Sequence, residues 1–160
     1  MTFRGFGLTG FGFGPQTNNT RLVTAAAGNP ELFTDPNIQS ANYSTSANVT
    51  RSSGLVTYAA ATNLQALTLT STLLSDFNAA IAANGGTGAI FDIALTYATG
   101  VSGNQRLRIW NGAVVLLTPA GAGVLTGLVT AGATSAAGLF LGGDTTPLTA
   151  SFTKISVKLH

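Results

Sequence analysis

The sequence predicts an all-β protein: an antiparallel β-sandwich with one short helical insertion and an extended N-terminal arm. From about residue 38 onward, short apolar-rich segments alternate with turn residues, which is the spacing of β-sandwiches. Residues 73–81 alone place their apolar side chains at helical spacing. The first residues combine phenylalanine with glycine, so they carry apolar groups but have little intrinsic backbone order.

Length and charge set the domain organisation. A chain of 160 residues commonly folds as one domain with a single hydrophobic core. We therefore expect an arm and linker over 1–30 and one sandwich domain over 31–160. Charged residues make up only 8% of the sequence, whereas soluble domains typically contain about a quarter. The surface is therefore expected to be neutral. Copies of such a surface repel each other weakly, which favours a homo-oligomer.

The N-terminal arm is predicted to anchor the protein to a partner. Large apolar side chains contribute much contact area when a partner offers pockets, and glycine lets the backbone follow that partner closely. The expected anchoring residues are Phe3, Arg4, Phe6, Phe11 and Phe13. The alternative is an edge strand or lid that packs on its own domain.

The predicted strands begin with a patch at Thr20–Thr24 in the linker. The strongest strand is Ala89–Ala98, where aromatic and aliphatic residues occupy every second position and define one buried face. Its buried residues are Phe91, Ile93, Leu95 and Tyr97. The other predicted strands are Ser53–Ala59, Gln65–Thr70, Gln105–Asn111, Ala113–Thr118, Val124–Thr130, Gly138–Leu141 and Phe152–Leu159.

A hairpin is predicted at Asn111-Gly112, because both residues tolerate the positive φ of a tight two-residue turn. Gln105–Trp110 and Ala113–Thr118 should then pair antiparallel.

The single helix is predicted to follow Thr72 and to stop at Asn84-Gly85-Gly86. Residues 112–141 carry no charge, but proline and several glycines interrupt them, so we expect strands and loops there rather than a membrane span.

Few residues could support catalysis. The only histidine is His160, and the spacing Gly5-x-Gly-x-x-Gly10 lacks the flanking strand and helix of a dinucleotide site. A glycosidase pair from Asp92 and Asp144 is conceivable, but nothing in the sequence places them together. We expect no enzymatic activity, no catalytic residues and no cofactor.

Metal and nucleic-acid binding are also not expected. Glu31, Asp35 and Asn37 could supply oxygen ligands to calcium, but Asp35-Pro36-Asn37 is an ordinary turn sequence. The seven basic residues are scattered along the chain, whereas phosphate binding needs several on one surface.

One candidate contact site lies on the strand before the predicted hairpin. Alternation sends Leu107 and Ile109 to one face and Arg106, Arg108 and Trp110 to the other. An aromatic plane beside planar cations is suited to sugars and acidic surfaces. In the alternative reading, Trp110 covers a second apolar layer and the arginines face solvent or a neighbouring subunit.

Four segments, in order, resemble jelly-roll, carbohydrate-binding-like modules of phage and prophage structural proteins. Their shared features are an opening Glu-Leu, a glycine-marked strand, a Leu-x-Gln-x-Leu-Thr-Leu-Thr-type strand and a closing Ile-Ser-Val-Lys. The corresponding residues are Glu31–Asp35, Ser53–Thr57, Leu64–Thr70 and Lys154–Lys158.

The resemblance implies a jelly-roll sandwich located on the surface of a phage particle. Three functional classes follow. The first is a capsid decoration or cement protein, or another virion-surface subunit, anchored to virion proteins by its arm and trimeric as such modules often are. The second is a receptor-binding module of a tail fibre or baseplate, with Arg106, Arg108 and Trp110 binding a host glycan. The third is a bacterial surface or matrix protein unconnected with phage.

Overall fold

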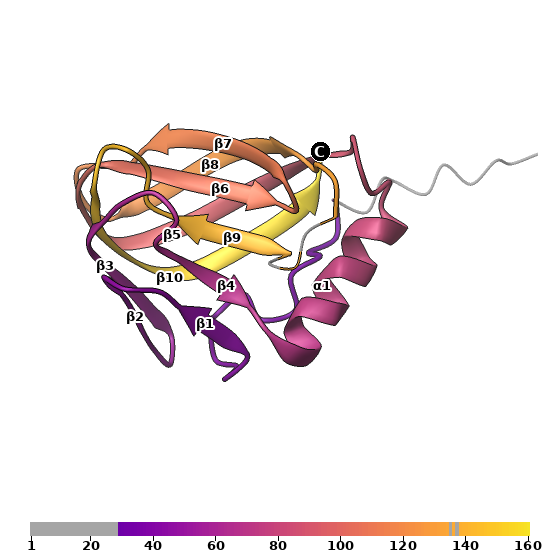
Figure 1. Cartoon of the computed structure of the whole chain (residues 1–160), viewed down its shortest axis with the longest axis horizontal. Helices are drawn as coiled ribbons and strands as arrows, with labels where there is room; N and C mark the ends of the chain where they lie inside the picture. Colours follow the sequence, from indigo (N-terminus) through magenta and orange to yellow (C-terminus); the bar gives the residue numbers. More distant parts are fainter. Residues whose placement is uncertain (1–28, 135, 137) are drawn as a thin grey trace, which may run out of the picture.

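In the part of the chain that the structure describes, ten strands form two antiparallel sheets that face each other (Figure 1). The computed structural model describes residues 29–134, 136 and 138–160. Sheet A has the strand order β1-β4-β9-β6-β7, and sheet B has the order β2-β3-β10-β5-β8. The elements are β1 (Tyr43–Thr45), β2 (Val49–Ser52), β3 (Leu55–Ala61), β4 (Ala66–Leu69), α1 (Ser71–Ala83), β5 (Ile90–Ser102), β6 (Asn104–Ile109), β7 (Gly112–Leu117), β8 (Gly123–Thr130), β9 (Leu139–Gly142) and β10 (Leu148–Leu159).

The prediction of an all-β sandwich with one short helix is confirmed for the described residues. Each strand predicted from residue 53 onward has a counterpart in β3 to β10, while β1 and β2 were not predicted. The jelly-roll connectivity stays a prediction. The strand expected at Thr20–Thr24 and nearly all of the arm and linker lie outside the described residues.

The core lies between the sheets and is centred on the two longest strands, β5 and β10, which pair with each other in sheet B. Period-two alternation on β5 gives the predicted inward face, and its side chains are almost completely buried. These residues are Phe91, Ile93, Leu95 and Tyr97. Between them, the outward residues of β5 lie on the outer surface of the sandwich.

The helix α1 lies beside the sandwich and closes part of its core (Figure 1). Leu73, Phe77 and Ile81 occupy its buried face, and the Phe77 ring meets the Phe33 ring edge-on at 6.1 Å between centroids. The Asn84 side chain donates to the Ala80 carbonyl at 2.8 Å, and Gly85 follows with a positive φ. The predicted stop signal therefore ends the helix as expected. In the described part of the chain, no helix is long and apolar enough to cross a membrane.

The hairpin between β6 and β7 forms as predicted, but its turn is shifted by one residue. Ile109 pairs with Gly112, so the two turn residues are Trp110 and Asn111, and the positive φ of 53° falls on Trp110. Gly112 is the first residue of β7 instead. A Cβ atom there would lie only 1.6 Å from the Thr130 carbonyl oxygen, so this position needs glycine for close backbone approach rather than for the turn.

Candidate binding surface

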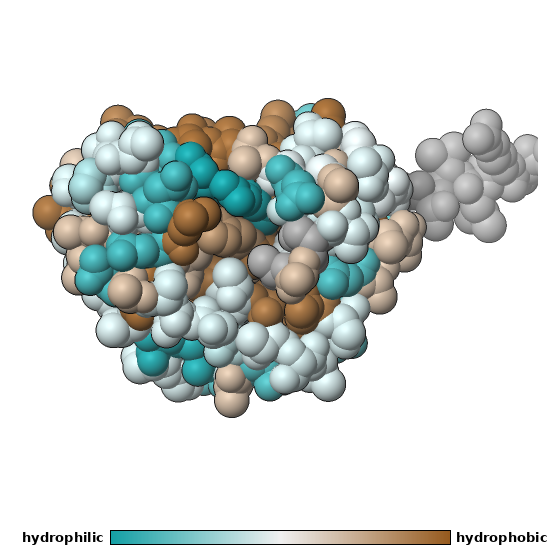
Figure 2. Space-filling view, in the orientation of Figure 1, coloured by the Kyte–Doolittle hydropathy of each residue, from teal (hydrophilic) through white to brown (hydrophobic). Residues whose placement is uncertain are grey.

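The outer face of sheet A carries a row of polar and aromatic side chains along β6. The strand register aligns Arg108 with Phe140 of β9 and Ala113 of β7, and it aligns Arg106 with Val115 of β7. Paired residues in a sheet point to the same face. In the space-filling view, hydrophilic residues cross this face below a hydrophobic upper edge (Figure 2).

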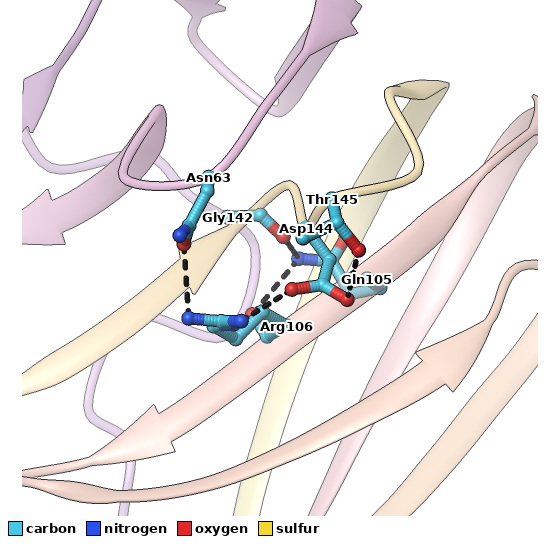
Figure 3. A network of polar contacts seen from close by, with 6 residues as sticks. All are labelled: Asn63, Gln105, Arg106, Gly142, Asp144 and Thr145. Atoms are coloured by element: carbon cyan, nitrogen blue, oxygen red, sulfur yellow. Dashed lines mark hydrogen bonds and ion pairs between the residues drawn. The ribbon is translucent and has the colours of Figure 1, made fainter.

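Arg106 is held by groups from two loops (Figure 3). Its guanidinium forms an ion pair with Asp144 and donates to the Asn63 side-chain oxygen at 2.9 Å. Thr145 donates to the other Asp144 oxygen at 3.4 Å. The side chains of Arg106 and Asp144 are only 18% and 11% exposed. The positive charge of Arg106 is therefore compensated within the chain, and its position is fixed.

Beneath this row, Gln105 points into the core and joins the two sheets. Its amide oxygen accepts from the Tyr97 hydroxyl of sheet B at 2.7 Å, and its amide nitrogen donates to the Gly142 carbonyl at 2.9 Å. Tyr58 makes a similar cross-sheet bond, donating to the Leu141 carbonyl at 2.7 Å. These buried polar groups thus have partners, as a low-dielectric interior requires.

Burial raises the pKa of the Tyr97 and Tyr58 hydroxyls above their ordinary value. The cause is desolvation, which disfavours the phenolate in an apolar interior. Both groups therefore remain protonated and act as hydrogen-bond donors across the sandwich. Their geometry indicates a structural role in holding the sheets together.

Arg108 differs from Arg106 in that its side chain forms no hydrogen bond or ion pair with any described residue. Its guanidinium carbon lies 4.9 Å from the centroid of the Phe140 ring, a cation–π contact. Its Nε is buried and has no hydrogen-bond acceptor among the described residues. The side chain is partly exposed on the outer face of sheet A, so its charge can be reached from solvent.

The prediction that Trp110 shares a face with the two arginines is wrong. Trp110 lies in the turn after β6 and is only 5% exposed. Its indole nitrogen donates to the Asn78 side chain of α1 at 2.8 Å, so the ring lies against the helix within the core. Strand alternation stops at the end of a strand, which is why it could not place this side chain. The alternative reading placed Trp110 over a second apolar layer; Trp110 does pack with apolar residues, but they belong to the main core.

The acidic residues considered for calcium serve as hydrogen-bond acceptors for nearby groups. Glu31 accepts from the backbone nitrogens of Phe33 at 3.1 Å and Val157 at 2.6 Å. Asp35 accepts from the backbone of Gln39 at 2.9 Å and from the Tyr43 hydroxyl at 3.0 Å. These contacts fix the turn that leads into the sandwich. No cluster of three potential metal ligands occurs in the part of the chain that the structure describes.

The two carboxylates considered as a glycosidase pair have separate partners. Asp92 lies on β5 of sheet B and contacts the His160 ring at 3.1 Å. Asp144 follows β9 of sheet A and is engaged by Arg106. The structure assigns each a local contact on its own sheet.

The predicted anchoring residues Phe3, Arg4, Phe6, Phe11 and Phe13 lie outside the described residues.

A second surface, which we name the apolar edge, is formed by the end strands of the two sheets. β7 ends sheet A and β8 ends sheet B. Both expose large aliphatic side chains on their outer faces: Val115 and Leu117 on β7 are 38% and 74% exposed, and Val124 and Leu128 on β8 are 63% and 50% exposed. Hydrophobic residues line the top of the molecule, where Figure 1 places these strands (Figure 2). Residues 112–141 contain no charge, so the apolar edge is neutral.

Sequence reasoning did not identify Phe140 and Asn63 as parts of the surface. They come from segments far from β6 in the chain, and only strand pairing brings them beside the arginines. Gln105 had a usable signal, because it has the same parity as Leu107 and Ile109 and is the one polar residue on that inward face.

Comparison of the chain with models of protein families, with curated proteins and with solved structures found no match.

Proposed function

We propose that this protein is a non-enzymatic structural subunit of a phage virion, a capsid decoration or cement protein or another surface subunit. In this proposal, copies of the sandwich associate through the apolar edge, and the segment over 1–30 anchors them to other virion proteins. The apolar edge is the observation that carries the proposal. It offers two end strands with exposed aliphatic side chains and no charge.

Open sheet edges of this kind are suited to pairing with another strand. An edge strand presents unpaired backbone donors and acceptors, and monomeric proteins protect such edges with charged residues or proline. Neither β7 nor β8 contains a charged residue or a proline, and β8 is eight residues long. We therefore infer a contact in which backbone pairing and aliphatic burial act together.

A second copy of the chain is the occupant that this surface favours. Both end strands are neutral, so β7 of one copy meets no repulsion from β8 of the next. Both strands belong to the apolar edge, and we infer that β7 of each copy meets β8 of the next around a three-fold axis, which closes a ring of three. This gives the trimer that the resemblance implies.

The strand order supports a jelly-roll interpretation of the domain. Strands β3 to β10 are shared between two four-stranded groups, β3-β10-β5-β8 and β4-β9-β6-β7. We infer that these eight strands form a jelly roll, a fold of eight strands in two sheets that occurs in viral capsid proteins. Strands β1 and β2 extend one side of each sheet.

The assembly proposal is tested by placing a charge on the apolar edge. Leu117→Lys should convert the full-length protein from a trimer to a monomer, because a buried, unpaired ammonium group opposes association. Leu64→Lys is the matched control, since Leu64 is 68% exposed but lies away from the edge. Light scattering after size exclusion would measure the mass, with 16.1 kDa expected for the monomer.

A monomeric unaltered protein, or a Leu117→Lys variant that keeps its oligomeric mass, would contradict assembly through this edge. A dimer that Leu117→Lys disrupts would retain the edge contact and overturn the three-fold arrangement.

The virion location is tested separately, with an antibody against the chain and particles purified from the organism that encodes it. We expect labelling at the particle surface. Deleting residues 3–15 should leave a folded domain, checked by circular dichroism, that no longer sediments with particles. Retained sedimentation would overturn anchoring by the arm, and unlabelled particles would overturn the virion assignment.

A further inference from the structure

Arg108 carries a charge that the chain itself does not neutralise. All five carboxylates of the sequence are described in the structure, and none forms an ion pair with Arg108. Asp144 pairs with Arg106 and Asp92 contacts His160. Glu31 and Asp35 accept hydrogen bonds near the start of the sandwich, while Asp76 lies on α1. Among the described residues, no acidic side chain therefore serves as a counterion for Arg108, and its charge is open to an anionic ligand.

The other partly buried arginines show how this chain usually satisfies a guanidinium. Arg51 also stacks on an aromatic ring, 4.9 Å from the Tyr43 centroid, but it donates to the carbonyls of Ile38 and Ser40. Arg106 donates to Asn63 and Asp144. Among the described residues, Arg108 has the ring contact alone.

The surroundings of Arg108 orient its guanidinium and leave the side chain partly exposed. The Phe140 ring supports one plane of the group, and the adjacent residue on β7 is the small Ala113, which cannot cover it. A planar guanidinium fixed in this way presents paired N–H donors that match the two oxygens of a carboxylate.

The neighbouring polar groups favour a ligand rich in hydroxyls. Asn63 and Thr145 are exposed beside Arg106, and the carboxylate of Asp144 can accept hydrogen bonds. Hydroxyl groups donate well to such a carboxylate, and an acidic saccharide offers several of them, whereas an acidic peptide such as tri-glutamate has none.

We propose that Arg108, supported by Phe140, binds the carboxylate of an acidic saccharide on the outer face of sheet A, with the cluster around Arg106 contacting the sugar hydroxyls. The inference is independent of the assembly proposal, because the site lies one strand inside the apolar edge and a β7–β8 contact leaves it open.

The test is calorimetric titration of the full-length protein with tri-galacturonate, with neutral galactotriose and with a tri-glutamate peptide. We expect measurable binding of tri-galacturonate alone, weakened about tenfold or more by Arg108→Gln. Lys154→Gln is the control for net charge, since it removes an exposed cation from sheet B and should change nothing. Arg108→Lys, which keeps the charge but loses the planar pair of donors, should bind more weakly than the unaltered protein.

Nitrogen-detected NMR of the Arg108 side chain provides a readout in the unaltered protein, so it does not require that any variant folds. Its Nε resonance should shift with tri-galacturonate and stay unchanged with galactotriose. No binding of tri-galacturonate at millimolar concentration, equal binding of the neutral sugar, or binding of the peptide in preference to the acidic sugar would each overturn the proposal.

Discussion

At the scale of single residues, the Tyr97–Gln105 pair shows how a polar group contributes to an apolar core. Gln105 is fully buried, and its three side-chain hydrogen bonds reach a side chain of sheet B and two backbone carbonyls of sheet A. Removing one member of such a pair leaves the other buried and unsatisfied, which costs more than the bond itself contributes.

A double-mutant cycle on this pair should therefore be non-additive. Gln105→Leu removes the acceptor of the Tyr97 hydroxyl and a donor to the Gly142 carbonyl, and it should lower the free energy of unfolding by about 2–4 kcal/mol. Tyr97→Phe leaves the Gln105 oxygen unsatisfied and should cost about 1–3 kcal/mol. The double variant should be less destabilised than the sum of the two, by about 1 kcal/mol, because the orphaned hydroxyl is gone. Urea unfolding measures all four proteins, and strict additivity would refute the coupling.

The residues of the candidate surface were only partly predictable. Alternation along the strand correctly separated Leu107 and Ile109 from Arg106 and Arg108. It could not show that one arginine is neutralised and the other is not, since Asp144 and Phe140 reach β6 only through the pairing of β9 with β6. The side chain of Trp110 was misplaced for a related reason, because its partner Asn78 belongs to the helix.

At the scale of elements, glycines mark where segments of the chain approach each other most closely. Gly112 begins β7 against the Thr130 carbonyl at the end of β8. Gly121, in the loop between these two strands, has open space around the position of a Cβ atom. The two glycines therefore have opposite structural requirements although they lie in neighbouring segments.

Alanine substitution should separate the two glycines. Gly112→Ala forces the Thr130 backbone to move and should lower the free energy of unfolding by about 2 kcal/mol or more. Gly121→Ala is the matched control and should change it by no more than about 0.5 kcal/mol. Thermal unfolding followed by circular dichroism compares them, and equal stabilities of the two variants would show that the close approach at Gly112 is not required.

Some elements were predicted and others were missed because their sequence signals differ in strength. β5 has a long alternating pattern, and α1 has both apolar periodicity and a glycine stop. β1 and β2 are three and four residues long and largely polar, so no alternation distinguishes them from a loop. The turn was predicted one residue too late because Gly112 was assigned to the turn. Gly112 is instead needed where β7 lies close to the Thr130 backbone, and local turn preferences do not include such a tertiary contact.

At the scale of the whole molecule, the two proposed contacts depend on different interactions, one on apolar burial and the other on charge attraction. The apolar edge is neutral and aliphatic, whereas the Arg108 site relies on an uncompensated cation. Salt screens interactions between exposed charges but leaves aliphatic burial unweakened.

A salt titration should therefore distinguish them in one protein. Raising sodium chloride from about 0.05 to 0.5 M should weaken tri-galacturonate binding several-fold and leave the oligomeric mass unchanged. Calorimetry and light scattering on the same samples provide the two readouts. Dissociation of the oligomer by salt would contradict a neutral interface, and salt-independent sugar binding would contradict a charged site.

The first described residues run alongside the last strand, since the Leu32 nitrogen donates to the Val157 carbonyl at 2.8 Å. Consequently, a reporter fused after His160 would lie close to Leu32, and it would hinder binding of a partner by the residues that precede it. The loop at Thr145–Pro147, at the far end of the 12-residue β10, is exposed and about 35 Å away along the strand. A tag inserted there would leave the leading residues clear, but it would disturb Thr145 and Asp144 beside Arg106, so the two ends of β10 carry different risks for a fusion.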